Sequence, residues 1–241
     1  MIAILTDFGD SEYAGVMKGV ICTMCAEARI IDITNNVPSH NIREGAWILF
    51  ISYRYFPRGT IFLCVVDPGV GSSRNAIAVK TKNYFFVGPD NGLMYPAMKS
   101  DGIIDARKLD TNGASKTFHG RDVFAKSAGF IEGRKQFELL GNRIEIMERF
   151  AFYRKGREGE VVRIDSFGNI ITNLEHIGKK RYNVTAGKKL KAELDFFENY
   201  ESSGKGLFLV EGSSGTLEIA RKNSGAAEIL RLKIGERITI L

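Results

Sequence analysis

Apolar and amphipathic segments alternate along the first half of the chain. Short apolar runs predict buried strands at residues 2–5, 29–33, 60–66, 76–81 and 84–87. Apolar side chains at three- and four-residue spacing predict helices at residues 15–25, 42–55 and 122–132. We expect the last helix to be N-capped near Arg121 and Asp122, and the last two strands to form a hairpin. The alternation predicts an α/β layered sheet whose strands are mostly parallel.

The pattern changes after about residue 150. Helical periodicity becomes weak, and short apolar runs separated by turns occur at residues 161–164, 169–172, 206–210, 216–220 and 236–240. Such spacing is typical of a small β domain of barrel or sandwich type. We therefore expect an N-terminal α/β domain over residues 1–153 and a smaller C-terminal antiparallel β-barrel-like domain over residues 154–241.

The composition is that of an ordinary globular protein. The 241 residues are 44% hydrophobic and 26% charged, which is enough apolar material for a sizeable core. No apolar stretch reaches the roughly 20 residues that a membrane-spanning helix needs. The first strand leads straight into Thr6 and Asp7 with no basic segment before it, so we expect no signal peptide. These features predict a cytoplasmic protein that does not bind membranes.

The net charge of +6 raises the question of nucleic-acid binding. Lys and Arg are scattered, however, with only short clusters at residues 179–181 and 188–189, and no nucleic-acid motif accompanies them. We therefore expect no nucleic-acid partner. Cys22 and Cys25 have C-x-x-C spacing within a predicted helix, but no second pair completes a zinc site. This arrangement predicts buried thiols on a helix face.

Two glycine-rich segments carry the strongest chemical signal. Residues 66–74 read Val-Asp-Pro-Gly-Val-Gly-Ser-Ser-Arg, and residues 117–122 read Thr-Phe-His-Gly-Arg-Asp. Each residue alone has a plain explanation, because Asp67 suits a turn, Arg74 a salt bridge and His119 a loop. Asp67 ends a predicted buried strand, however, and catalytic side chains commonly lie on loops held by a sheet. If the loops meet, these three side chains would hold and polarise one water molecule.

Three other polar segments are candidate binding sites. Asp7 directly follows the first strand, where a carboxylate suits a ribose diol, although it also suits a helix cap or a turn. Its Asp-Phe-Gly string also occurs in protein kinases, but nothing kinase-like precedes it. Residues 165–169 place polar side chains beside an aromatic ring, and residues 212–215 read Gly-Ser-Ser-Gly. The first suits an adenine edge and an amino group, and the second suits a carboxylate; both also suit simple turns.

In their order and spacing, these strings closely resemble the S-adenosylmethionine (SAM) hydroxide adenosyltransferases, which are hydrolases related to fluorinase and chlorinase. The resemblance runs from Ile2 to about Ala227. It implies a larger α/β domain, a small antiparallel β domain, and a homotrimer with active sites between subunits. The implied reaction is hydrolysis of SAM to adenosine and L-methionine by attack of water or hydroxide at C5′, without metal or other cofactor. The resemblance makes Asp67, Arg74 and His119 the catalytic set.

The resemblance also implies a substrate-binding set. It places the ribose on Asp7, the adenine on Asn169, and the amino and carboxyl groups of methionine on Asp165, Ser213 and Ser214. Arg221, Lys222 and Asn223 match a segment whose backbone meets adenine. The implied substrate-binding residues are Asp7, Phe118, Gly120, Asp165, Phe167, Asn169, Ser213, Ser214, Glu218, Arg221, Lys222 and Asn223.

Departures from the halide-using relatives favour water as the nucleophile. Those relatives carry a tyrosine where this chain has Asp67, and they lack His119. A carboxylate repels a halide by about 4 kcal/mol at 4 Å and an effective dielectric constant near 20. Position 40 is His where fluorinase has a stacking tryptophan, and the loop at residues 9–13 is a residue shorter than in many relatives. A non-catalytic adenosine- or SAM-binding protein remains the main alternative, a SAM-dependent halogenase is a weaker one, and the residues leave open whether Asp67 or His119 takes the proton.

Overall fold

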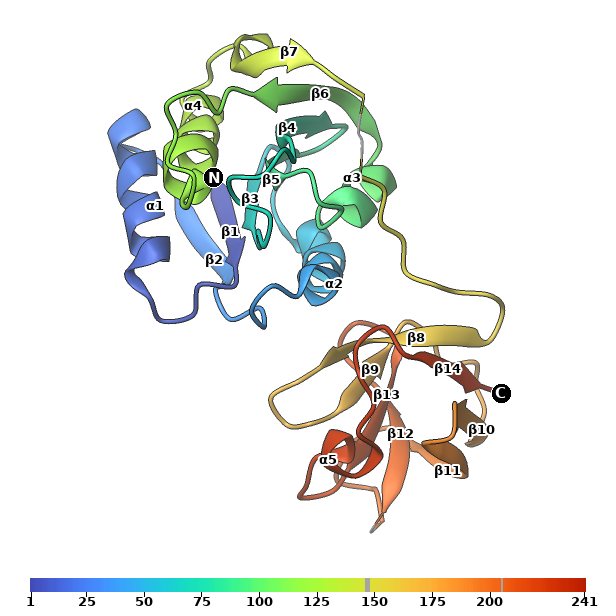
Figure 1. Cartoon of the computed structure of the whole chain (residues 1–241). Coiled ribbons are helices and arrows are strands. Elements are labelled where there is room, and N and C mark those ends of the chain that lie inside the picture. The colour runs from blue at the N-terminus through green and yellow to red at the C-terminus, as the bar shows by residue number, and fades with distance from the viewer. Residues whose placement is uncertain (146–147, 205) are drawn as a thin grey trace. The chain divides into compact units, whose positions relative to one another are not determined.

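The computed structural model describes residues 1–145, 148–204 and 206–241. The chain divides into two compact units, Met1–Ala151 and Phe152–Leu241 (Figure 1). Each unit has its own hydrophobic core, so each is described by itself.

The N-terminal unit is a seven-stranded sheet covered by helices on both faces (Figure 1). Its strands, in the sheet order β2-β1-β3-β5-β4-β6-β7, are β2 (Ile30–Thr34), β1 (Ile2–Thr6), β3 (Ile61–Val65), β5 (Phe85–Pro89), β4 (Ala76–Thr81), β6 (Ile103–Leu109) and β7 (Gly141–Arg143). The helices are α1 (Glu12–Met24), α2 (Ile42–Ser52), α3 (Tyr95–Asp101) and α4 (Lys126–Glu132). Short helical turns are η1 (Tyr53–Tyr55), η2 (Gly120–Ala125, π-helical) and η3 (Phe137–Leu140).

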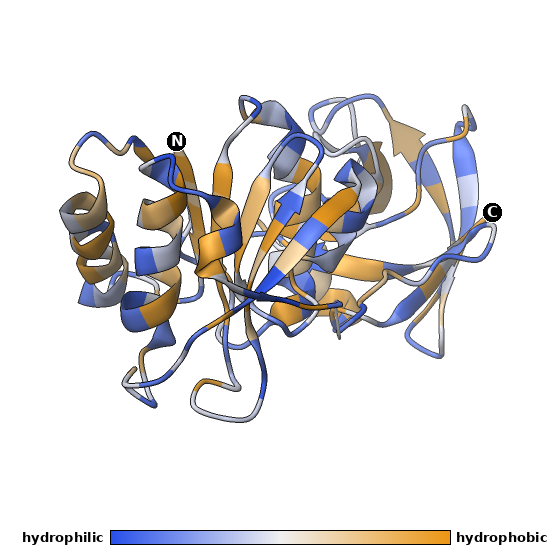
Figure 2. Ribbon diagram, turned by 90° about the horizontal axis from the view of Figure 1, so that it is seen from above, coloured by the Kyte–Doolittle hydropathy of each residue, from blue (hydrophilic) through white to orange (hydrophobic). Residues whose placement is uncertain are grey.

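Two hydrophobic layers hold this sheet between its helices. On one face, α1 and α4 contribute Met17, Ile21 and Ala128, and on the other α2 and α3 contribute Leu49 and Met98. Every residue of β1 and β3 is buried, because both faces of these central strands are covered. Figure 2 shows this as hydrophobic residues along the strands, flanked by helices of mixed hydropathy.

The sheet is mixed, so the α/β class is confirmed but the expectation of a mostly parallel sheet is wrong. The pairs β1–β2, β1–β3 and β3–β5 are parallel. The pairs β4–β5, β4–β6 and β6–β7 are antiparallel. The predicted hairpin of β4 and β5 is present, and it introduces the reversed strand on which the antiparallel half is built.

Two local predictions in this unit are also wrong. The helix expected from residue 122 begins earlier, as η2 at Gly120, with His119 in the N-cap position in place of Arg121 and Asp122. Cys22 is exposed and Cys25 half-buried, because α1 packs against the sheet through other positions. Within the described ranges, no helix combines the length and apolarity needed to cross a bilayer.

The C-terminal unit is a closed barrel, as the sequence predicts. Its strand order is β10 (Arg181–Ala186), β11 (Leu190–Phe197), β12 (Leu207–Glu211), β13 (Leu217–Arg221), β9 (Ile170–Thr172), β8 (Glu158–Ile164) and β14 (Arg237–Ile240), which pairs again with β10. The pairing of β11 with β12 is parallel, and the other neighbours are antiparallel. A short helix, α5 (Ala226–Leu230), packs on the barrel core.

Candidate functional site

Asp67 and Arg74 lie on the loop that leaves β3 and form a buried ion pair. Arg74 Nε donates to Asp67 Oδ1 at 2.9 Å, and Arg74 Nη2 donates to Asp67 Oδ2. The side chains are only 6% and 11% exposed, so water screens the pair weakly. Both of these contacts go to one carboxylate, which fixes its orientation.

His119 joins this pair from the second glycine-rich loop. Its Nδ1 lies 3.0 Å from Arg74 Nη2. Because a guanidinium can only donate, Nδ1 must accept, and a neutral His119 therefore carries its proton on Nε2. Burial and the neighbouring Arg74 charge lower the pKa of His119, although Asp67 and Asp122 act in the opposite direction. The lowered pKa favours a neutral imidazole beside the Asp67 side chain.

Gly71 explains why the two loops can meet. Its φ is +76°, and a Cβ there would lie 2.3 Å from the backbone oxygen of Lys116, shortly before His119. A side chain at position 71 would therefore push the loops apart. Phe124 of η2 supports the cluster from the same side, with its ring centroid 5.3 Å from Arg74 Cζ. The two glycine-rich loops, whose meeting was the condition for the predicted water site, therefore do meet in the fold.

A cavity of about 280 Å³ opens beside this cluster. Its lining consists of Asp7, Phe8, Ser11, Tyr13, Ser39, His40, Val65, Asp67, Val70, Thr117, Phe118, His119 and Gly120. Asp7 follows β1 and Asp67 follows β3, so the cavity lies at the carboxyl ends of adjacent parallel strands, where α/β sheets usually bind ligands. The N-terminal members of the predicted set are therefore brought together.

Asp7 also has a structural contact. Its Oδ2 accepts a hydrogen bond from the His40 backbone N–H at 2.8 Å. Ser11, not Asp7, occupies the N-cap position of α1. His40 adopts φ +64°, an uncommon conformation for a residue with a side chain, and it lines the cavity. The sequence gives no signal for this contact, since His40 is notable there only as a departure from fluorinase.

Three aromatic rings form one wall of the same cavity. The ring centroids of Phe8 and Tyr13 lie 5.6 Å apart, and those of Tyr13 and Phe118 lie 5.0 Å apart, both in edge-to-face geometry. Arg121 lies over the Phe118 ring and is held by Asp122 through contacts of 2.7 and 2.9 Å. Tyr13 was not predicted as a site residue, and its only signal in the sequence is its place in the loop after Asp7.

The C-terminal unit has a separate cavity of about 1030 Å³. It is lined by Arg163, Asp165, Phe167, Asn169, Ile171, Tyr200, Glu201, Glu211, Gly212, Ser213, Glu218, Arg221, Lys222, Asn223 and Ser224. Every predicted C-terminal site residue except Ser214 is among them. The Ser214 hydroxyl instead bonds the Thr216 hydroxyl at 2.8 Å.

Asp165 organises one wall of this cavity. Its Oδ1 accepts from the backbone N–H groups of Phe167 and Asn169, and its Oδ2 accepts from Asn169 Nδ2 at 2.9 Å. The last contact orients the Asn169 amide, leaving its oxygen as the acceptor. A Cβ on Gly168 would lie 2.6 Å from Gly225 Cα, so glycine lets this turn pack against the segment that follows Asn223.

Glu218 lies on β13 and is only 6% exposed. Tyr200, which the sequence analysis did not select, donates its hydroxyl to Glu218 Oε2 at 2.8 Å. Burial raises the pKa of Glu218, the Asp165 charge adds to the rise, and Tyr200 and Arg163 oppose it. Burial and the Glu218 contact also raise the pKa of Tyr200, so its phenol stays protonated and acts as the donor.

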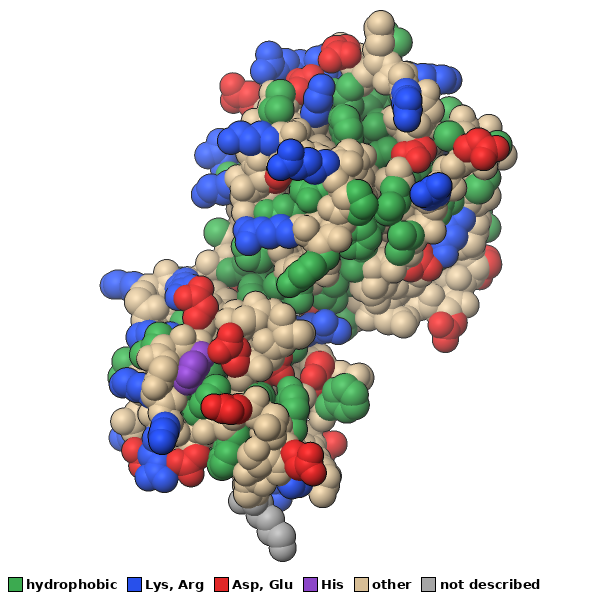
Figure 3. Space-filling view, turned by 180° about the vertical axis from the view of Figure 1, so that it is seen from behind, with side chains coloured by type: hydrophobic (Ala, Val, Ile, Leu, Met, Phe, Trp, Pro, Cys, Tyr) green, Lys and Arg blue, Asp and Glu red, His purple; other side chains and the backbone are tan. Residues whose placement is uncertain are grey.

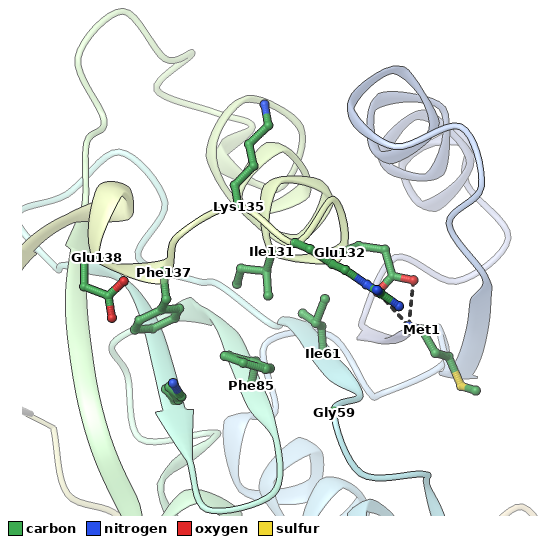
Figure 4. A pocket seen from close by; sticks show the side chains of 11 residues that line it. Met1, Gly59, Ile61, Phe85, Ile131, Glu132, Lys135, Phe137 and Glu138 are labelled. Atoms are coloured by element: carbon green, nitrogen blue, oxygen red, sulfur yellow. Dashed lines mark hydrogen bonds and ion pairs between the residues drawn. The ribbon is translucent and has the colours of Figure 1, made fainter.

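A further cavity of about 470 Å³ in the N-terminal unit has different surroundings (Figure 4). Met1, Ile61 and Phe85 place it where β1, β3 and β5 begin, which is the opposite end of the parallel strands from Asp67. Figure 4 shows the Met1 amine joined to Glu132, at distances of 2.7 and 2.6 Å. None of the predicted site residues lines it.

Searching the described residues finds no group of three or more His, Cys, Asp and Glu side chains arranged to hold a metal ion. On the face drawn in Figure 3, Lys and Arg side chains gather along one edge of the N-terminal unit, and acidic side chains are scattered over the rest of the face. The absence of a nucleic-acid partner stays a prediction.

Comparison with known proteins identifies the family. Residues 2–141 match the SAM hydroxide adenosyltransferase N-terminal domain, and residues 159–239 match the C-terminal domain. The chain belongs to the SAM hydroxide adenosyltransferase family. The resemblance inferred from the motifs is thereby confirmed.

Individual members of this family and a solved structure are similar to the chain over its full length. The (R)-S-adenosyl-L-methionine hydrolase of Methanocaldococcus jannaschii is 33% identical, covering 100% of this chain and 95% of the relative. A fluorinase of Nocardia brasiliensis is 24% identical, covering 100% and 96%. The crystal structure of an uncharacterized conserved protein from Thermotoga maritima superposes with a TM-score of 0.92 at 34% identity, covering 100% of both chains.

Proposed function

We propose that this protein hydrolyses SAM to adenosine and L-methionine. The observation that carries the proposal is the Asp67–Arg74–His119 cluster beside a cavity at the carboxyl ends of the sheet, in a chain of this family. A sulfonium is a good leaving group, so the reaction needs an aligned water more than acid assistance at sulfur. The cluster supplies groups that hold and deprotonate such a water.

Asp67 is the proton acceptor in this proposal. Arg74 occupies the Nδ1 lone pair of His119, so the neutral imidazole presents only its Nε2–H, which donates to the water oxygen. Each Asp67 oxygen accepts from Arg74 yet keeps a second lone pair. The water oxygen bonds to C5′, the C5′–S electron pair leaves with sulfur as the methionine thioether, and the water proton passes to Asp67. No metal or other cofactor takes part.

The binding roles form part of the same proposal. Asp7 keeps Oδ1 for the ribose hydroxyls, because His40 engages Oδ2. Asn169 binds adenine, and the methionine end lies at Asp165 and Ser213. Phe118 and Gly120 serve the N-terminal cavity. Phe167, Glu218, Arg221, Lys222 and Asn223 line the C-terminal one, and Ser214 lies next to it in the chain, beside Ser213.

We further propose a cytoplasmic homotrimer with active sites between subunits. The resemblance supports the trimer. Phe167, an aromatic residue of the C-terminal cavity, is 78% exposed in the single chain and would be covered if a neighbouring subunit completed that cavity.

The sulfonium configuration of the substrate is a further part of the proposal. Related proteins carry the name (R)-S-adenosyl-L-methionine hydrolase, and because L already fixes the α-carbon, (R) refers to sulfur. We therefore expect this protein to prefer the (R)-sulfonium epimer. Incubation with each purified epimer tests this, and equal turnover of the two would contradict it.

The decisive experiment is turnover in H₂¹⁸O and halide-free buffer. The expected result is adenosine and methionine in amounts that scale with the protein, with ¹⁸O at the adenosine 5′ oxygen. Binding of SAM without adenosine formation would instead support the non-catalytic alternative. A 5′-halogenated product after adding fluoride or chloride would support the halogenase alternative, which the Asp67 charge disfavours.

A further inference from the structure

The Tyr200–Glu218 pair is a built feature of the C-terminal cavity that the proposed mechanism does not use. Tyr200 engages Glu218 Oε2, whereas no donor in the described part of the chain bonds Oε1. That oxygen lies against Gly212, where a Cβ would come within 1.7 Å of it. Gly212 therefore provides the space for the carboxylate, and a larger residue would displace it.

Two carboxylates share this cavity at close range. Asp165 is near enough to raise the pKa of both Glu218 and Tyr200. Asp165 Oδ2 has a single contact, from Asn169 Nδ2, and so keeps a lone pair. Of the cations that line the cavity, Arg163 lowers the pKa of Glu218, but less strongly than burial raises it. A ligand cation with several N–H donors would satisfy both carboxylates.

We propose, resting on SAM as the substrate and on the amino-group role that the resemblance implies for Asp165, that Glu218 also binds the α-ammonium of the methionine end. Tyr200 is then a positioning residue: its hydroxyl occupies Oε2 and leaves Oε1 for the ligand. The primary ammonium carries three donors, which suits two carboxylate acceptors. Adenosine lacks this group, so the pair distinguishes the substrate from the nucleoside product.

Calorimetric titration of matched ligands tests this assignment. S-adenosyl-L-homocysteine carries the ammonium, and 4-(5′-adenosylthio)butanoate keeps its carboxylate but lacks the ammonium. We expect Glu218→Gln to weaken binding of the first about tenfold or more, because a charge-assisted hydrogen bond is lost. Binding of the second should change by less than about twofold. Tyr200→Phe, at a half-exposed ring, should also lower the affinity for S-adenosyl-L-homocysteine relative to the affinity for 4-(5′-adenosylthio)butanoate.

A second Tyr–Glu pair in the same unit provides the control. The Tyr153 hydroxyl bonds Glu158 Oε2 at 3.0 Å, and neither residue lines the cavity. Tyr153→Phe and Glu158→Gln should leave the affinity ratio unchanged. Equal weakening of both ligands by Glu218→Gln, or no weakening of either, would overturn the assignment while leaving SAM hydrolysis standing. A wild-type protein that binds neither ligand would overturn the proposed function as well.

Discussion

Three side chains with one guanidinium at their centre determine the chemistry at the scale of single residues. Arg74 contacts both Asp67 oxygens and also His119 Nδ1, so it fixes the orientation of one neighbour and the tautomer of the other. A histidine whose lone pair is occupied donates through Nε2–H. The residue types alone left the proton acceptor undecided, and the contact between Arg74 and His119 favours Asp67.

Replacing Asp67 by Asn tests its assignment as the base. The amide keeps the shape but accepts a proton poorly, so we expect kcat to fall by about a hundredfold or more. Loss of the charge also leaves Arg74 buried without its counterion, so thermal stability should fall too. Asp105→Asn is the control, because Asp105 pairs with Arg107 in a similarly buried setting outside both cavities. If both variants kept wild-type kcat in a coupled adenosine assay, Asp67 would not be the base.

His119 should make stability depend on pH. Its pKa in the folded protein lies below the ordinary 6.5, chiefly through burial and then through Arg74. The unfolded chain therefore takes up the proton first, and the free energy of unfolding falls as the pH drops below 6.5 toward the folded-state pKa. Urea unfolding of wild type and His119→Asn at pH 7.5 and 5.5 measures this. The variant should lose less stability between the two pH values, and an equal loss would contradict the prediction.

At the scale of elements, the site is assembled by the close approach of two loops, one with Gly71 and one with Lys116. Gly71 should tolerate alanine poorly, because φ +76° is strained for alanine and the new Cβ would meet the Lys116 oxygen at 2.3 Å. Gly113 is the matched control, since its φ is +72° but nothing lies within 4 Å of its Cβ position. Gly113→Ala should cost only about 1 kcal/mol of stability. Gly71→Ala should lower the free energy of unfolding by more than this, and it should also lower turnover. If the two variants had equal effects in stability and turnover assays, the close approach to Lys116 would be unimportant.

The sequence predicts where strands lie better than it predicts which strands pair with each other. Apolar runs locate β1 and β3 well, because strands buried on both faces need continuous hydrophobicity. β6 was missed, because two of its seven residues are exposed isoleucines and others are charged. Its pairing with β4, which extends the antiparallel half of the sheet, is a long-range choice without a local signal.

The site residues, too, include some that have a local signal in the sequence and some that have none. Asp67, Arg74 and His119 stand beside glycines and a proline, so their loops are visible in the sequence. Tyr200 has no such neighbours in its motif, and its role depends on a contact 18 residues away with Glu218. Contacts of this kind follow from how β11, β12 and β13 pair in the barrel, which sequence spacing does not encode.

At the scale of the whole molecule, all predicted site residues except Arg74 and Ser214 line two cavities, one on each unit. The proposed trimer makes each active site from the N-terminal unit of one subunit and the C-terminal unit of a neighbour. Complementation of two inactive variants tests this directly. Asp67→Asn damages only the first cavity, and Asn169→Ala damages only the second.

Refolding the two variants together in equal amounts should restore activity. If subunits mix at random in a ring of head-to-tail interfaces, about a quarter of the sites receive two intact halves. Mixing Asp67→Asn with Arg74→Gln should restore none, because both changes damage the same cavity. Light scattering of each mixture would establish that the assemblies have the mass of three chains. The first mixture could also form trimers and yet gain no activity. That result would mean that the N-terminal and C-terminal cavities of each active site come from one chain, because mixing subunits could then never join two intact cavities.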